Sequence, residues 1–199
     1  MKQQESEEQE EVTLLGYQGV LPVEWERLDS PVDTATRWRQ EHDNTVLLQG
    51  LLVLDEQPKV EHEEELSAFG QELQRIDYKL NLVLELLTQT LRSWRKLPEP
   101  VAVELSVEKV IWCTAEPPPQ GEPVLVKLYL SPIFPNPFVA TGKVTSVRRG
   151  EETNRVEVRF DGLGAQVHDA LEKMVFRQHR RDVARARQRR RTASGPGVS

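Results

Sequence analysis

The feature that most constrains the fold is a run of apolar residues whose spacing alternates between three and four. Its members are Leu66, Phe69, Leu73, Ile76, Leu80, Val83, Leu87 and, after polar Thr90, Trp94. This spacing keeps one apolar seam of an α-helix turned toward a partner helix, and it persists for about four heptads, near the minimum expected of a coiled coil. At about 1.5 Å per residue the helix would be a rod about 40 Å long. We therefore predict that residues 61–97 form a helix that drives self-association.

The apolar stripe of this heptad helix widens in its second half, where Leu82, Leu84, Leu86 and Leu91 are apolar as well. A two-stranded seam needs no such width, so the pattern favours three or four helices, or a helix that also packs on its own domain. An ordinary amphipathic helix that closes one core is the alternative. We prefer a tetramer and assign its contacts to Leu66, Phe69, Leu73, Ile76, Leu80, Val83, Leu84, Leu87, Leu91 and Trp94.

Composition limits the class of protein further. Of the 199 residues, 38% are hydrophobic and 29% are charged, which leaves room for one domain of about 100–150 residues with accessory helices. Cys113 is the single cysteine, so no intramolecular disulfide forms and an oxidising compartment is not indicated. The first residues are too acidic for a signal peptide, and no stretch approaches the roughly 18–20 apolar residues of a membrane span. We expect a soluble, cytoplasmic protein.

The formal net charge of −6 conceals opposite charges at the two ends of the chain. The start carries Glu5, Glu7, Glu8, Glu10 and Glu11, and the end carries Arg177, Arg180, Arg181, Arg185, Arg187, Arg189, Arg190 and Arg191. Each end repels itself and attracts the other. No aromatic residue is interleaved with the arginines after Phe176, so we expect a solvated helix face rather than nucleic-acid binding. Contact with an anionic surface is a weaker hypothesis.

Residues 1–29 show no regular pattern. Residues 1–12 have the composition of a disordered tail, and residues 13–29 mix Gly16, Gly19 and Pro22 with scattered apolar residues. We expect this segment to be disordered or irregular.

A helix-start signature follows, with Ser30 as the cap and Pro31 at the first helical position. It predicts an accessory helix over residues 30–57. Residues 46–54 near its end are densely apolar around Gly50, so this part must pack against another element. The heptad helix is the nearest candidate.

Beyond Pro98 and Pro100 the apolar period changes from helical to alternating, as is typical of strands. The candidate strands cover residues 101–105, 110–113, 124–130, 138–147 and 155–160. Their connections are short and contain no helix, so we predict an antiparallel sheet curled into a small barrel. The helical period returns from Ala165, and we expect this closing helix to cover the barrel with Val167, Ala170, Leu171, Met174 and Val175.

The order of these elements resembles that of a known family. The stretches ELSVEKVIW, PVLVKLYLS, VATGKVTSV, RVEVRF and HDALEKMVFRQHRR follow one another from Val101 to about Arg181. This stretch resembles a PilZ domain, and the heptad helix directly before it resembles that of atypical members that tetramerise through such helices. The resemblance implies an α+β fold, with a small antiparallel six-stranded β-barrel, a preceding heptad-repeat helix in a multi-helix coiled coil and a C-terminal helix.

On this basis we divide the chain into five parts. Residues 1–29 are the disordered or irregular N-terminal segment, 30–57 the accessory helix and 61–97 the heptad-repeat oligomerisation helix. Residues 98–182 are the PilZ-like barrel with its closing helix, and 183–199 are an Arg-rich tail.

Typical PilZ domains bind cyclic di-GMP through an RxxxR motif before the barrel and a DxSxxG motif at its first strands. Guanidinium groups stack on guanine and fork onto phosphate oxygens, the carboxylate accepts from a base edge, and glycine permits a close backbone approach. The second motif aligns with Glu104, Ser106 and Lys109, of which only the serine matches. Lysine places a bulky side chain where the family has a bare backbone.

The first motif also departs from the family pattern. Arg92, Arg95 and Lys96 form RxxRK instead of two arginines four apart, and lysine neither stacks nor forks as arginine does. We therefore expect no cyclic di-GMP binding. If it occurs, the degenerate site comprises Arg92, Arg95, Lys96, Glu104, Ser106 and Lys109.

No other group of residues forms a convincing metal-binding or catalytic motif. The histidines show no paired ligand spacing, so we expect no metal site: His42, His62, His168 and His179. His168 with Asp169, and Glu172 with Lys173, are typical of a solvated face or of capping charges. Cys113, in a predicted strand, is expected to be a small buried hydrophobe. No nucleophile elbow or P-loop occurs, so we expect no catalytic residue, no cofactor and no enzyme.

Two functional hypotheses follow. The first is a non-enzymatic PilZ-like protein that self-associates and, as the resemblance implies, acts through an unidentified protein partner in bacterial type IV pilus function, motility or virulence. The second is a cyclic di-GMP receptor that uses a degenerate motif.

Overall fold

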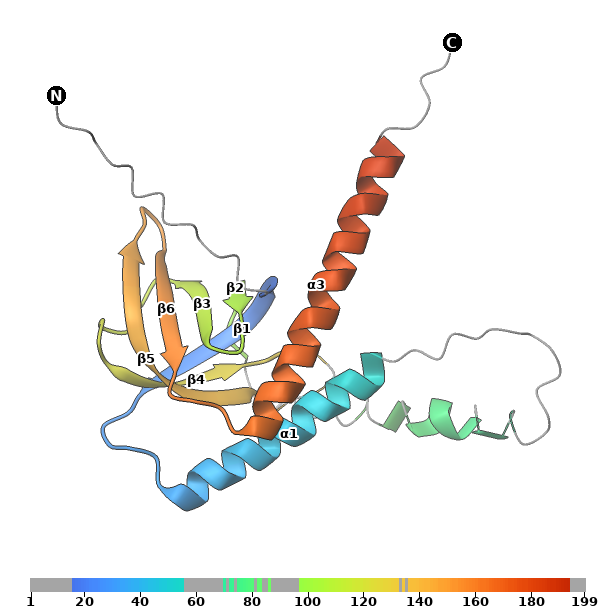
Figure 1. Cartoon of the computed structure of the whole chain (residues 1–199), viewed down its shortest axis with the longest axis horizontal. Helices are drawn as coiled ribbons and strands as arrows, with labels where there is room; N and C mark the ends of the chain where they lie inside the picture. Colours follow the sequence, from blue (N-terminus) through green and yellow to red (C-terminus); the bar gives the residue numbers. More distant parts are fainter. Residues whose placement is uncertain are drawn as a thin grey trace, which may run out of the picture.

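The computed structural model describes residues 16–55, 70, 72–73, 75–80, 82–83, 86, 97–132, 134 and 136–193, with backbone alone at 55, 182 and 185–193. Its elements are β1 (Tyr17–Arg27), α1 (Thr34–Asp55), β2 (Pro100–Leu105), β3 (Lys109–Thr114), β4 (Pro123–Leu128), β5 (Phe138–Arg149), β6 (Asn154–Phe160) and α3 (Ala165–Ala193). Figure 1 shows the strands gathered into one body, with α1 passing along one end of it and α3 rising from α1.

The six strands form a closed barrel in the order β1-β2-β3-β6-β5-β4, and every neighbouring pair is antiparallel. This confirms the predicted α+β class and the six-stranded barrel. Side chains alternate along each strand between the interior and the surface. The strand residues of the buried core cluster are Leu21, Val103, Leu105, Val110, Trp112, Val124, Val126, Leu128, Phe138, Ala140, Val144, Val156, Val158 and Phe160.

Strand β1 is the sixth strand, and the expectation that residues 13–29 are irregular is wrong for Tyr17–Arg27. Residues 17–22 pair with β2 and residues 23–27 pair with β4, so one strand closes both sides of the barrel. Pro22 lies where the partner changes, opposite Pro100, and its carbonyl accepts a hydrogen bond from the Tyr129 N–H. A proline at this point removes no essential ladder donor, so its presence does not exclude a strand.

Helix α1 confirms the predicted accessory helix, but its cap is Asp33 and not Ser30. The Asp33 carboxylate accepts hydrogen bonds from the Thr36 backbone N–H at 3.0 Å and from the Thr36 hydroxyl at 2.6 Å. These bonds, the hydroxyl's first, lower the pKa of the Asp33 carboxyl below its ordinary value. The cap therefore stabilises the fold at pH above that ordinary value and loses its contribution as the pH falls through the lowered pKa.

The apolar end of α1 packs on the barrel and on α3. The expected contact with the heptad helix stays a prediction, since most of that helix lies outside the described residues. Leu47 and Leu48 are buried, whereas Val46 and Val53 are exposed. Gly50 faces the Phe134 ring from the β4–β5 connection, since a Cβ there would lie 2.9 Å from the ring's Cζ. The densely apolar segment is thus half buried by its own domain.

Asn44 fixes α1 to the barrel. Its side-chain Nδ2 donates to the Val139 carbonyl at 2.7 Å, and the Val139 N–H donates to Asn44 Oδ1 at 2.9 Å. Strand β6 pairs with β5 only as far as Gly142, so this part of the β5 edge lacks a strand partner. The buried Asn44 carboxamide completes the backbone hydrogen bonds at this edge.

Helix α3 confirms the predicted closing helix. Val167, Ala170, Leu171 and Val175 are buried, and Met174 packs against the core. The Arg177 guanidinium donates to the Leu52 carbonyl at 3.0 Å and ties α3 to the end of α1. The helix continues to Ala193, so the boundary drawn between residues 182 and 183 does not interrupt the backbone.

We predict that Asn44→Ala lowers the free energy of unfolding by about 2–4 kcal/mol, because the Val139 N–H and carbonyl both lose their partner. Urea unfolding followed by circular dichroism measures the change. Gln49→Ala, at an exposed position of the same helix, is the control and should change stability by less than about 0.5 kcal/mol. Equal effects of the two variants would contradict the role given to Asn44.

Candidate functional site

The described residues of the heptad helix expose the apolar seam. Leu73, Ile76, Leu80 and Val83 lie in helical backbone, and each is 51–56% exposed in the single chain. Leu82 and Leu86 beside them are exposed as well. The other predicted contact residues lie outside the described residues: Leu66, Phe69, Leu84, Leu87, Leu91 and Trp94. Apolar residues at this spacing favour burial against another helix.

The residues aligned with the DxSxxG motif occupy the β2–β3 hairpin. The Arg155 Nη2 of β6 donates to both carboxylate oxygens of Glu104, at 3.0 and 3.1 Å. Lys109 Nζ donates to Glu157 at 3.2 Å. Both charged candidates therefore already have partners on β6, and a ligand that used Glu104 as an acceptor would compete with Arg155 for this carboxylate.

Ser106 is a turn residue in this structure. It is buried, and its hydroxyl accepts from the Glu108 and Lys109 N–H groups and lies 3.2 Å from the Lys109 carbonyl, to which it donates. The Ser106 hydroxyl thus satisfies backbone groups of the three-residue connection between β2 and β3. The serine that matches the DxSxxG motif therefore has a structural role in the hairpin turn.

The other half of the candidate nucleotide site cannot be placed, because Arg92, Arg95 and Lys96 lie outside the described residues. The structure therefore brings Glu104, Ser106 and Lys109 onto one hairpin and shows nothing of their relation to the RxxRK segment.

An open depression of about 200 Å³ lies on the outer wall of the barrel beside Glu104. Small residues, Gly19, Ala102 and Cys113, lie between larger side chains there, and the Glu104–Arg155 pair forms part of its rim. Cys113 is half-buried and lines this depression, so the expectation of a buried cysteine is wrong. Sequence reasoning missed the depression because Gly19 belongs to the unassigned strand β1.

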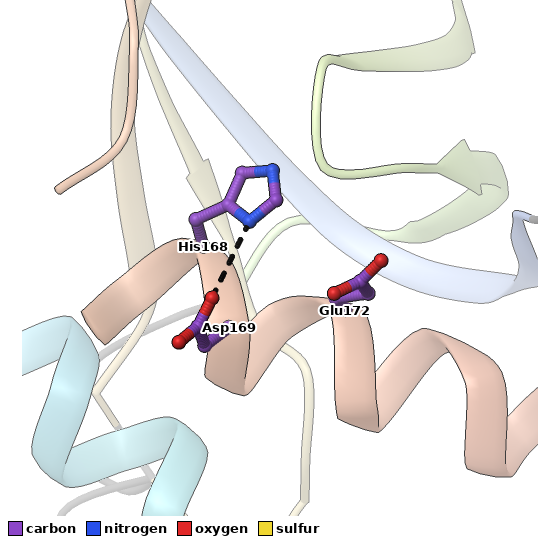
Figure 2. Close-up of side chains that lie close together, drawn as sticks. All are labelled: His168, Asp169 and Glu172. Carbon is purple, nitrogen blue, oxygen red and sulfur yellow. Dashed lines mark ion pairs between the residues drawn. The ribbon is translucent and has the colours of Figure 1, made fainter. Parts of the chain in front are cut away.

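A second group of polar side chains lies on the first turns of α3. The ligand atoms of His168, Asp169 and Glu172 all lie within 4.8 Å of one another, and His168 Nδ1 is 3.8 Å from Asp169 (Figure 2). The i, i+1, i+4 spacing could have revealed this cluster, which a search for paired histidines misses. Its side chains are solvated and it sits at the positive end of the helix, where an acidic cluster is favoured without a metal.

No helix in the described part of the chain combines the length and the apolar character needed to cross a membrane.

Comparison with known proteins places this geometry in a family. Residues 48–189 match the family model described as "Atypical PilZ domain, cyclic di-GMP receptor". The chain belongs to the atypical PilZ domain family. This confirms the resemblance drawn from the order of strands and helices, and the PilZ match includes residues of the heptad segment and of α3. No curated protein matches the chain.

One solved structure shares the fold, and two others match part of the chain. A tetrameric PilZ domain from Xanthomonas campestris, self-assembled through an unusual helical bundle, superposes with a TM-score of 0.69 at 24% identity, over 87% of this chain and 92% of that one. The PilZ domain of YcgR from Escherichia coli with cyclic di-GMP matches 44% of this chain and 76% of that one at 18% identity, with a TM-score of 0.36. The Bacillus subtilis inhibitor of motility MotI/DgrA matches 40% of this chain and 41% of that one at 13% identity, with a TM-score of 0.33.

We predict that Ser106→Ala lowers the free energy of unfolding by about 1–2 kcal/mol, because the hairpin backbone loses the hydroxyl while its own Ser106–Lys109 backbone bond remains. Chemical denaturation measures the effect. Ser146→Ala, opposite Glu157 on the outer face of β5, is the control and should leave stability almost unchanged. An unchanged midpoint for Ser106→Ala would show that the hydroxyl has no structural role.

Proposed function

We propose that this PilZ protein is a non-enzymatic adaptor that self-associates through its heptad helix, with a tetramer preferred. It acts in the cytoplasm by protein contacts in type IV pilus function, motility or virulence, without binding cyclic di-GMP. The observation that carries the proposal is the exposed apolar seam of Leu73, Ile76, Leu80 and Val83. A soluble chain buries such a seam against copies of itself or against a partner helix.

The width of the stripe supports more than two helices. Leu82 and Leu86 flank the seam and are exposed in the single chain. A helix with apolar residues at its flanking positions buries them only when several helices surround it. The tetrameric assembly described for the Xanthomonas neighbour is consistent with this number.

The mechanism we infer is multivalent presentation. The heptad segment lies between β1 and β2 in the sequence, so each helix of a bundle carries one barrel at its base. Several barrels held together raise the effective concentration of one binding surface at a partner, without any new contact in each barrel. This mechanism requires no catalytic group, no metal and no cofactor.

The hairpin geometry supports the absence of nucleotide binding. Glu104 is paired with Arg155, Lys109 is paired with Glu157, and Ser106 serves the turn. Exposed ion pairs of this kind contribute at most about 1 kcal/mol each to stability. These ion pairs matter because they turn the Glu104 and Lys109 side chains toward β6.

The second candidate function is a cyclic di-GMP receptor with a degenerate motif. The description of the matching family as cyclic di-GMP receptors favours it. In that case Glu104 would act one methylene further from the backbone than the family's aspartate, and Arg92 and Arg95 would supply the cations.

We predict that Leu73→Asp with Leu80→Asp converts the assembly to monomers or aggregates, because charges in the seam cannot be buried unpaired. Multi-angle light scattering measures the molar mass. Tyr78→Asp is the matched control: Tyr78 is 70% exposed on the same helix, away from the seam, and this variant should keep the wild-type mass. An unchanged mass in the double variant would contradict the assembly.

Calorimetry with cyclic di-GMP decides between the two candidate functions. We predict no saturable heat at micromolar ligand for the wild-type chain. Saturable binding that disappears in Arg92→Ala with Arg95→Ala would instead establish the receptor function. The light-scattering mass of that variant serves as its control, since both arginines lie in the heptad segment.

A further inference from the structure

A groove lies between α1 and the start of α3. The first turn of α3 lies against α1 (Figure 1), and the open depression beside this contact has a volume of about 230 Å³. Its lining consists of residues 164–167 at the start of α3 and, on α1, of Trp38, Glu41, His42 and Thr45. The groove shares no residue with the heptad seam or with the β2–β3 hairpin, so it is a separate surface.

An exposed aromatic pair lines the groove on α1. Trp38 is 70% exposed, and its indole stacks on the His42 imidazole with ring centres 5.8 Å apart and ring planes 9° apart. The two residues are neighbours on one face of the helix because they are four positions apart. The stack holds the indole in one orientation, which lowers the entropy that a ligand must remove on binding. A tryptophan presented in this way is typical of a residue that anchors a partner.

The Glu41 carboxylate lies against Gly164, just before α3. A Cβ on Gly164 would be 2.8 Å from Glu41 Oε2 and 3.0 Å from Oε1, so the glycine makes room for the carboxylate. The unpaired N–H groups at the start of a helix favour a negative charge at this place. Glu41 is half-buried, and its carboxylate forms no hydrogen bond or ion pair with another described residue. Its oxygens are therefore able to accept hydrogen bonds from a ligand.

The charge of the groove favours a cationic ligand. Among the described residues that line it, Glu41 carries the only carboxylate and none is a lysine or an arginine. Arg37 and Glu41 both line a smaller neighbouring depression, but no ion pair joins these two described side chains. Trp38 and Glu41 are three positions apart, so their Cβ atoms are about 5–6 Å apart on the helix surface. One cationic side chain can therefore contact both the indole and the carboxylate.

We propose that this groove binds an arginine side chain of a partner protein. The planar guanidinium stacks on the Trp38 indole and donates two hydrogen bonds to the Glu41 carboxylate. A lysine ammonium makes neither a planar stack nor a two-bond fork, so arginine is the better fit. A purely apolar partner would cover the indole but would also remove water from an unpaired carboxylate, which is unfavourable. The start of α1 is therefore an arginine-recognition surface, in addition to the self-association and nucleotide hypotheses.

A titration of the full chain with acetyl-Ala-Arg-Ala-amide, followed by fluorine NMR, tests this proposal. The chain has four tryptophans, which are labelled as 5-fluorotryptophan, and the Trp38→Phe variant identifies the signal of residue 38. This signal should shift saturably, and acetyl-Ala-Lys-Ala-amide should bind about tenfold more weakly or worse because the two-bond fork is lost. No saturable shift of the Trp38 signal, or equal affinities for the two peptides, would overturn the proposal.

Two variants locate the carboxylate that the peptide uses. Glu41→Gln keeps the shape of the side chain and removes its charge, so arginine-peptide binding should weaken by about tenfold or more. Asp43→Asn is the matched control, because Asp43 is exposed on the same helix and lines neither depression, and its affinity should stay at the wild-type value. The signal of Trp112, which is 2% exposed, reports whether each variant is folded. Unchanged affinity in Glu41→Gln, or an equal loss in both variants, would contradict arginine recognition by Glu41.

Discussion

Closure of the barrel by β1 is the constraint on which the rest of the structure depends. This strand pairs with β2 along its first half and with β4 along its second half, so it closes the ring of strands. Helix α1 and the heptad segment lie between β1 and β2 in the sequence. The barrel strands β1 and β2 therefore fix both ends of this inserted segment.

The helices extend this arrangement. Asn44 completes the open part of the β5 edge, and Arg177 joins α3 to the end of α1. These polar contacts are directional, so they specify how α1 and α3 lie on the barrel, while the buried apolar residues supply most of the stability. The described residues of the heptad seam, Leu73, Ile76, Leu80 and Val83, take no part in this packing and stay exposed in the single chain.

Sequence reasoning located most strands because their apolar residues alternate. Val124, Val126 and Leu128 illustrate this pattern, and all three are buried in the barrel. It failed for β1 because a glycine and a proline interrupt the alternation, and because a strand whose partner changes midway has no local signature. At the candidate site it identified Ser106 and Glu104 by family alignment, but it could not foresee Arg155, which lies 51 residues away in the sequence.

The amino-acid sequence by itself determined the local elements: the heptad period, the alternating strands, the closing helix and the opposite charges of the two ends. These depend on residues close together in the chain, whose spacing sets which face is apolar. Only the tertiary structure decided which strand closes the barrel, which group pairs with Glu104 and which residues cover the end of α1. Those outcomes depend on contacts between distant residues, because a backbone edge or a charge is satisfied by whichever partner the closed fold brings to it.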